Sequence, residues 1–146
     1  MLQIVQAYDR RPIAEVETEG ADALEVELAA RSLRDRDQWL KPHERIEVLY
    51  RLASLMEPLR EKFSRLIAQE GGKPLVDAGV EANRAIDGVR NAAEELRNFA
   101  GREIPMGLTA ASTGRWAFTT REPIGVVVAI SAFNHPLDLI VHQWRQ

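Results

Sequence analysis

Asn134 has the clearest chemical potential in this sequence, because it follows the apolar run Val126 to Ile130 and stands two positions before Pro136. The run has the composition of a strand covered on both faces, and Pro136 can open a helix. This order places an amide side chain at the carboxyl end of a strand, where open α/β folds hold their ligands. The amide carries two N–H donors and could stabilise a carbonyl oxygen that becomes an oxyanion. A turn residue or a helix cap is the alternative that spacing alone leaves open.

Two other motifs could carry chemistry, and each has a simpler structural explanation. His135 and His142 would share one helical face, but only Asp138 stands near them as an acidic partner, so no metal site is predicted. The segment Gly71-Gly72-Lys73 resembles part of a phosphate loop. It lacks the preceding strand and the following Gly-Lys-Ser/Thr that such a loop requires, and a helix stop explains it better.

The composition excludes several classes of function. The 146 residues carry 19 basic and 22 acidic side chains with the signs interleaved, so neither nucleic acid nor a membrane surface is expected as a partner. Trp116 and Phe118 could stack a base, but the balanced charge favours sheet packing. The sequence contains no cysteine, and therefore no disulfide or cysteine nucleophile. The N-terminus lacks a signal-peptide pattern and no apolar run is long enough to cross a bilayer, so a cytoplasmic protein is expected.

The region that must position Asn134 is predicted to be helical over residues 20–101. Apolar residues recur there at steps of three and four, which indicates three to four amphipathic helices. Pro42 can open the strongest of these helices, and Pro58 should kink or split it. Gly71-Gly72 should end it, because glycine readily adopts the left-handed conformation of a helix end.

Short strands are expected on both sides of this helical region. Residues 1–19 are predicted as a strand hairpin with a turn before Pro12. Further along, Trp116 and Phe118 alternate with Ala117 and Thr119 as in an exposed strand, and the buried strand Val126 to Ile130 follows. The fold class predicted for the chain is mostly α with a few β-strands.

The sequence resembles the NAD(P)-dependent aldehyde dehydrogenase family over nearly its whole length. Arg121 to Val127 is similar to the family's Glu-Pro-hydrophobic-Gly-Val motif, and Phe133 to Leu137 is similar to its Phe-Asn-x-Pro motif. Glu70 to Leu75 resembles the Glu-Thr-Gly-Lys-Pro signature, with Gly71 in place of Thr. Residues 11–16 look like the family's N-terminal strand, and residues 44–52 like its second helix.

The resemblance implies that the complete enzyme has an α/β fold with a Rossmann-like cofactor domain and oxidises aldehydes to carboxylates by hydride transfer to NAD or NADP. It gives Asn134 the oxyanion-stabilising role. The residues that it places beside the nicotinamide are Ile130, Ser131, Ala132 and Phe133. Residues 113–130 then become an oligomerisation-type hairpin followed by the first buried strand, and residues 131–146 the start of the cofactor-domain helix. A homo-oligomer is expected.

The sequence also departs from the family pattern. The family's catalytic cysteine and its glutamate base follow far downstream, and neither has a counterpart here, while residues 144–146 do not match. We therefore expect residues 1–146 to be a truncated N-terminal part that is inactive alone and binds no cofactor by itself. The alternatives are a non-catalytic helical oligomerisation module and an acyl-phosphate or acyl-CoA reductase of the same fold.

Overall fold

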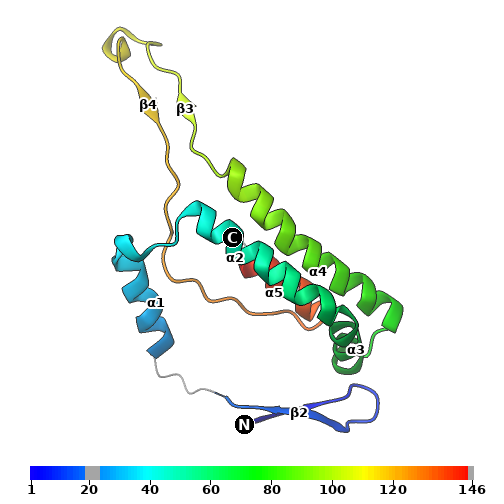
Figure 1. Cartoon of the computed structure of the whole chain (residues 1–146). Coiled ribbons are helices and arrows are strands. Elements are labelled where there is room, and N and C mark those ends of the chain that lie inside the picture. The colour runs from blue at the N-terminus through cyan, green and yellow to red at the C-terminus, as the bar shows by residue number, and fades with distance from the viewer. Residues whose placement is uncertain (19–23, 145–146) are drawn as a thin grey trace.

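The computed structural model describes residues 1–18 and 24–144 (Figure 1). Its strands and α-helices in chain order are β1 (Leu2–Val5), β2 (Pro12–Val16), α1 (Leu24–Arg34), α2 (Pro42–Met56), α3 (Arg60–Gly71), α4 (Leu75–Glu95), β3 (Glu103–Ile104), β4 (Ala117–Phe118) and α5 (Pro136–Trp144). Most of the ordered elements are helices, so the prediction of a mostly α-helical chain with a few β-strands is confirmed. Among the described helices, none combines the length and the apolar character that a membrane span requires.

The N-terminal strands form an antiparallel pair where a hairpin is expected. Leu2 lies opposite Val16 in the ladder between β1 and β2. The connection between the strands is fixed to the helical body, since the Ala7 amide donates to the Gln69 carbonyl of α3 over 2.8 Å. The hairpin is therefore attached to the end of α3, close to the loop that leads into α4.

The helix boundaries follow the proline and glycine signals of the sequence. α2 begins at Pro42, and Pro58 lies in the short 3-10 turn Glu57–Leu59 that separates α2 from α3. Proline has no amide hydrogen to donate and its ring clashes with the preceding turn, so the break falls there. After α3 ends, Gly72 has a φ of 66°, which is the left-handed conformation that glycine adopts without steric cost.

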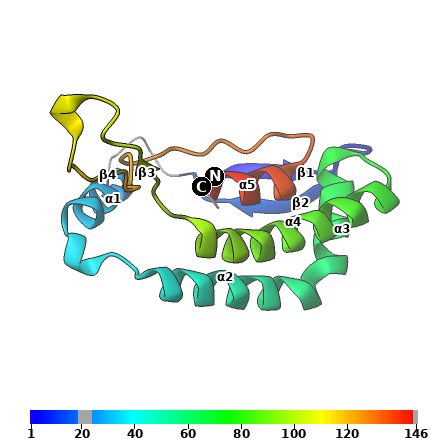
Figure 2. The same cartoon turned by 90° about the horizontal axis from the view of Figure 1, so that it is seen from above.

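α4 is the central element of the fold, because it lies between α2 on one side and α5 on the other (Figure 2). Its buried face carries several alanines, which let the neighbouring helices approach closely. Gly88 shows how close α5 comes, since a Cβ atom there would lie 3.5 Å from Cγ1 of Val141. The residues of the hydrophobic core are Ala53, Met56, Ala85, Ile86, Val89 and Val141. Full burial of a side chain such as Ile86 contributes about 1.5–3 kcal/mol.

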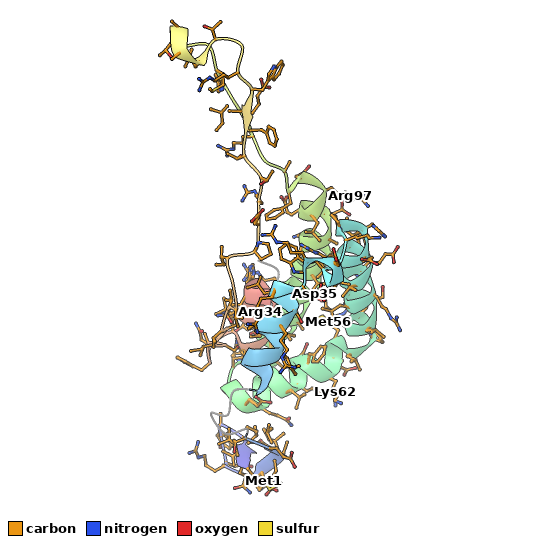
Figure 3. All side chains as sticks on the ribbon, turned by 90° about the vertical axis from the view of Figure 1, so that its left-hand side faces the viewer. Met1, Arg34, Asp35, Met56, Lys62 and Arg97 are labelled. Atoms are coloured by element: carbon orange, nitrogen blue, oxygen red, sulfur yellow. The ribbon has the colours of Figure 1, made fainter. Side chains whose placement is uncertain are left out.

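Residues between α4 and the segment before α5 project from the helices as a long arm (Figures 1 and 3). β3 pairs antiparallel with β4 in this arm, and Glu103 lies opposite Phe118. The strand that pairs with β4 is therefore β3, which lies before residues 113–130, in a stretch where the sequence indicates a loop. β3 is two residues long, which is too short for strand alternation to be visible in the sequence.

The predicted buried strand Val126 to Ile130 is wrong for this structure. The two strand pairs of the described chain are β1–β2 and β3–β4, and residues 126–130 belong to neither. Val128 is 77% exposed, so the segment is not covered on both faces. An apolar strand becomes buried only when neighbouring strands take its backbone groups and helices cover its faces. The described residues provide no such neighbours, so the segment is extended and unpaired.

Candidate functional site

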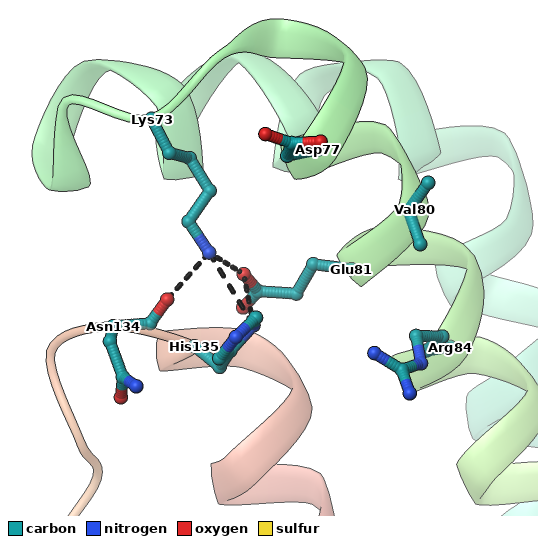
Figure 4. A pocket seen from close by; sticks show the side chains of 7 residues that line it. All are labelled: Lys73, Asp77, Val80, Glu81, Arg84, Asn134 and His135. Atoms are coloured by element: carbon teal, nitrogen blue, oxygen red, sulfur yellow. Dashed lines mark hydrogen bonds and ion pairs between the residues drawn. The ribbon is translucent and has the colours of Figure 1, made fainter.

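The candidate site lies where the loop between α3 and α4 meets the turn that precedes α5 (Figure 4). The two regions enclose an open cavity of about 370 Å³. The residues that line it are Lys73, Asp77, Val80, Glu81, Arg84, Asn134 and His135. The predicted site residue Asn134 is thus placed beside charged residues of α4 that are fifty or more positions away in the sequence.

Glu81 is the centre of the interactions in this site. It belongs to α4, is 1% exposed, and its Oε1 atom accepts hydrogen bonds from the backbone amides of Leu137 at 3.0 Å and Asp138 at 3.3 Å. These amides belong to the first turn of α5, where helix amides have no partner within their own helix. Glu81 therefore caps α5 from a different helix.

The charge state of Glu81 follows from its surroundings. Burial raises the pKa of this carboxyl, while hydrogen bonds from Lys73, Leu137 and Asp138 and the charge of Lys73 lower it. The lowering effects together exceed the effect of burial, and the pKa of Glu81 lies below its ordinary value of 4.5. Glu81 is consequently an anion at neutral pH, placed at the positive end of the α5 helix dipole.

Lys73 connects Glu81 to the turn that carries Asn134. Its Nζ atom lies 2.5 Å from Oε2 of Glu81 and also donates to the backbone carbonyl of Asn134 over 2.5 Å. The same ammonium lies 3.4 Å from Nδ1 of His135, and that nitrogen lies 3.3 Å from Oε2 of Glu81. Two hydrogens of the Lys73 ammonium thus have an oxygen acceptor, one on Glu81 and one on the Asn134 backbone.

The Asn134 side chain takes no part in these contacts. Figure 4 shows its amide directed away from Lys73 and Glu81. Within the described part of the chain no hydrogen bond of this side chain is found, and the residue is exposed. The helix-cap interpretation does not hold, because α5 begins at Pro136 and its first amides bind Glu81. Both donors of the Asn134 amide are therefore free to bind a ligand.

The four residues expected beside a nicotinamide lie in the extended segment that leads to Asn134. The segment is held at two points: the Gln143 side chain donates to the Ile130 carbonyl over 2.8 Å, and the Ser131 hydroxyl donates to the Pro136 carbonyl over 2.9 Å. Phe133 is 90% exposed. Ile130, Ser131, Ala132 and Phe133 thus form an anchored segment with exposed apolar side chains, and their role in cofactor binding stays a prediction.

The two histidines near the site belong to separate contacts. His135 faces Glu81, whereas Nε2 of His142 lies 3.4 Å from Oδ1 of Asp138. Across the described residues, no group of three His, Cys, Asp or Glu side chains is arranged to hold a metal ion. The geometry therefore assigns both histidines to carboxylate pairs.

The sequence reasoning missed Glu81 and gave Lys73 no role. A signal for Glu81 does exist, because it lies on the same helical face as Ala78, Ala82 and Ala85, all of which are buried. A charged residue within an apolar stripe requires a buried partner. The partners could not all be read from spacing, because the Leu137 amide meets Glu81 across 56 positions of sequence.

Comparison with known proteins identifies the family of this chain. The sequence model of the aldehyde dehydrogenase family matches residues 1–146. The chain is 33% identical over 143 residues to 3-sulfolactaldehyde dehydrogenase from Priestia megaterium, a match that covers 97% of this chain and 30% of that protein.

Solved structures agree with the sequence match. Aldehyde dehydrogenase 21 from Physcomitrella patens, in complex with the product succinate, superposes with a TM-score of 0.90 at 27% identity, over 99% of this chain and 30% of that one. Glyceraldehyde-3-phosphate dehydrogenase from Methanocaldococcus jannaschii, complexed with NADP, superposes with a TM-score of 0.80 at 27% identity, over 97% of this chain and 30% of that one. The chain thus spans about 30% of the length of these relatives. They are dehydrogenases, so neither the reductase nor the non-catalytic module is favoured.

Proposed function

This chain belongs to the aldehyde dehydrogenase family, and from that premise we propose that residues 1–146 form the N-terminal part of an enzyme that oxidises an aldehyde to a carboxylate with NAD or NADP. The observation that carries the proposal is the free Asn134 amide. It lies in the family's Phe-Asn-x-Pro motif, and Glu81 has taken over the capping task that would otherwise occupy it.

In the proposed reaction Asn134 stabilises charge on the aldehyde oxygen. A nucleophile from the rest of the enzyme adds to the aldehyde carbon, and the oxygen becomes an oxyanion. An amide N–H fixed in advance at that oxygen stabilises the transition state more than the ground state, because the charge develops during the reaction. Such donors act best when they need no reorientation, and the contacts of the turn hold the backbone from which the Asn134 amide extends.

The segment Ile130 to Phe133 is the proposed contact for the nicotinamide end of the cofactor. It is extended, exposed and apolar, and it leads directly into the residue that would bind the reacting oxygen. An exposed, extended segment of this kind could lie flat against the nicotinamide ring, which must be close to the substrate for hydride transfer. When bound, the cofactor would accept the hydride, while this segment excludes water from one side of the ring.

We also propose that a polypeptide of these 146 residues alone neither oxidises aldehydes nor holds NAD(P) firmly. The sequence contains no cysteine to act as the nucleophile, and an amide donor cannot replace it. Residues 126–130 have no strand neighbours among the described residues, so the sheet that would carry the rest of a dinucleotide is absent from this part of the chain.

The arm that contains β3 and β4 is the proposed surface for self-association. Trp116 is 87% exposed and Phe118 is 74% exposed, and both belong to an arm that extends beyond the helices (Figure 3). Large apolar side chains gathered on a projecting hairpin, next to unpaired strand edges, favour association with another copy.

A chimera tests the proposed function. The 143 aligned residues of this chain would replace the matched segment of the 3-sulfolactaldehyde dehydrogenase from Priestia megaterium, and NAD(P)H formation would be followed with that enzyme's aldehyde. We expect an active enzyme whose kcat falls on the order of 100-fold in Asn134→Ala, as for the loss of one oxyanion donor. A folded chimera that binds cofactor without turnover, or an Asn134→Ala chimera with unchanged kcat, would contradict the proposal.

A further inference from the structure

The Lys73–Glu81 ion pair has features that its contribution to stability does not explain. The Glu81 side chain is fully buried and that of Lys73 is 16% exposed, yet the surrounding face of α4 is built from small apolar residues. Removing two charges from water costs several kcal/mol for each ion, and buried ion pairs can often be replaced by apolar side chains without loss of stability. A pair in this position is therefore better explained by the geometry that it imposes.

The geometry is imposed on the turn that carries Asn134. Lys73 binds the backbone carbonyl of Asn134, and Glu81 binds the amides of Leu137 and Asp138. Both ends of the turn are thus tied to α4 and to the loop before it, while the Asn134 side chain is left outside the network (Figure 4).

We propose that Lys73 and Glu81 are positioning residues for Asn134: the pair holds the turn before α5 and occupies the helix end, so that the Asn134 amide stays directed toward the substrate. This inference rests on the proposed function, because it assigns a purpose to the orientation of Asn134. It does not make either residue a contact for the substrate or the cofactor.

Competition for the first amides of α5 explains why Glu81 is needed. Asn is among the preferred residues at helix N-termini, because its side-chain oxygen accepts hydrogen bonds from first-turn amides. If Glu81 no longer accepted the Leu137 and Asp138 amides, Asn134, which stands two positions before the helix, would be able to do so. The amide would then rotate onto the helix and lose its orientation toward the substrate.

The first experiment measures the network in the 146-residue chain without any catalytic readout. The variant Lys73→Met with Glu81→Leu removes both charges and leaves no unpaired ion in the core. We expect amide hydrogen exchange at Leu137 and Asp138 to become at least tenfold faster, with unchanged exchange in the α2–α4 core. Lys62→Met is the matched control, because Lys62 is an exposed lysine of α3 (Figure 3). Unchanged exchange at Leu137 and Asp138 would overturn the inference.

The second experiment uses the chimera and asks whether Lys73 acts through Asn134. Lys73→Met should lower kcat about tenfold with little change in KM, and Lys73→Arg, which keeps a donor, should restore part of the loss. In an Asn134→Ala background Lys73→Met should have no further effect on kcat, since residues that act through one another are not additive.

The outcomes separate this inference from the proposed function. The positioning role is overturned, and the proposed function stands, if Asn134→Ala lowers kcat but Lys73→Met leaves kcat unchanged. The same holds if the effects of the two substitutions on kcat are fully additive in the double variant. If Asn134→Ala itself is silent, the proposed function fails, and the positioning role fails with it. If Lys73→Met unfolds the chimera, the double variant with Glu81→Leu takes its place in the same comparison.

Discussion

Gly101 is the position where one added methyl group should have the clearest effect on the arm. A Cβ atom at this residue would lie 1.6 Å from the carbonyl oxygen and 2.6 Å from the carbonyl carbon of Thr119. Both atoms belong to the backbone, so no side-chain rotation can relieve the clash. Gly101→Ala must therefore separate the two chains at the base of the arm.

The expected magnitude follows from the contacts that the separation breaks. The Arg102 amide donates to the Thr119 hydroxyl over 2.9 Å, and the Thr119 amide donates to the Arg102 carbonyl over 2.9 Å. Each hydrogen bond contributes about 0.5–1.5 kcal/mol net, so opening the base costs about 1–3 kcal/mol locally. The β3–β4 pair, which has two residues in each strand, has little else to hold it together.

Amide hydrogen exchange at Thr119 measures this local cost, and light scattering measures its effect on self-association. We expect faster exchange at Thr119 in Gly101→Ala and a shift of the oligomer toward monomer, with the helical core unchanged. Gly79→Ala is the matched control, because its new Cβ would lie 3.9 Å from the Ser64 hydroxyl, an ordinary contact. Within a helix that change should be neutral or stabilising by up to about 1 kcal/mol. Unchanged Thr119 exchange in Gly101→Ala would refute the reasoning.

Three further predictions concern the chain as a whole. A polypeptide of residues 1–146 should form no NAD(P)H with a panel of aldehydes, and absorbance change that scales with purified protein would contradict this. It should elute as a dimer or larger species in size exclusion with light scattering, whereas a single peak at the 16.4 kDa chain mass would exclude self-association. Because the pKa of Glu81 is lowered by folding, its stabilising contribution is complete above pH 4.5 and is lost as pH falls through the folded pKa. Urea titrations should therefore show a weaker loss of stability between pH 5 and pH 3 for Glu81→Gln than for the wild-type chain; equal slopes would remove Glu81 as a contributor.

The helices of this chain could be predicted because their signals are local. The break at Pro58 and the left-handed end at Gly72 depend only on the backbone chemistry of those residues, and the 3.6-residue periodicity depends on near neighbours. β3 could not be predicted in the same way. Its two residues pair with β4 across 13 and 15 positions, and what allows the approach is the missing side chain of Gly101.

Asn134 of the candidate site could be predicted from the sequence, whereas the roles of Glu81 and Lys73 could not. Asn134 stands in a recognisable motif, but spacing could not decide between a ligand donor and a helix cap. That decision depends on Glu81, 56 positions before Leu137, and on Lys73, 61 positions before Asn134. Such pairs are made by packing of α4 against α5, which no local pattern encodes. The apolar run 126–130 fails for a different reason. Its composition indicates a buried strand, but it does not show which strands and helices would cover that strand.

The two parts of the proposed site therefore differ in what they need from the rest of an enzyme. The turn at Asn134 is fixed by contacts of Lys73 and Glu81 that lie entirely within the described chain. The segment 126–130 is extended and exposed, and its backbone groups are available to neighbouring strands. Under the proposed function, this chain alone holds the turn that carries the oxyanion donor, and strands from the rest of the enzyme would pair onto the segment that leads to it. A donor that had to reorient during the reaction would lose much of its effect, so a turn held by contacts of this chain favours the oxyanion role of Asn134.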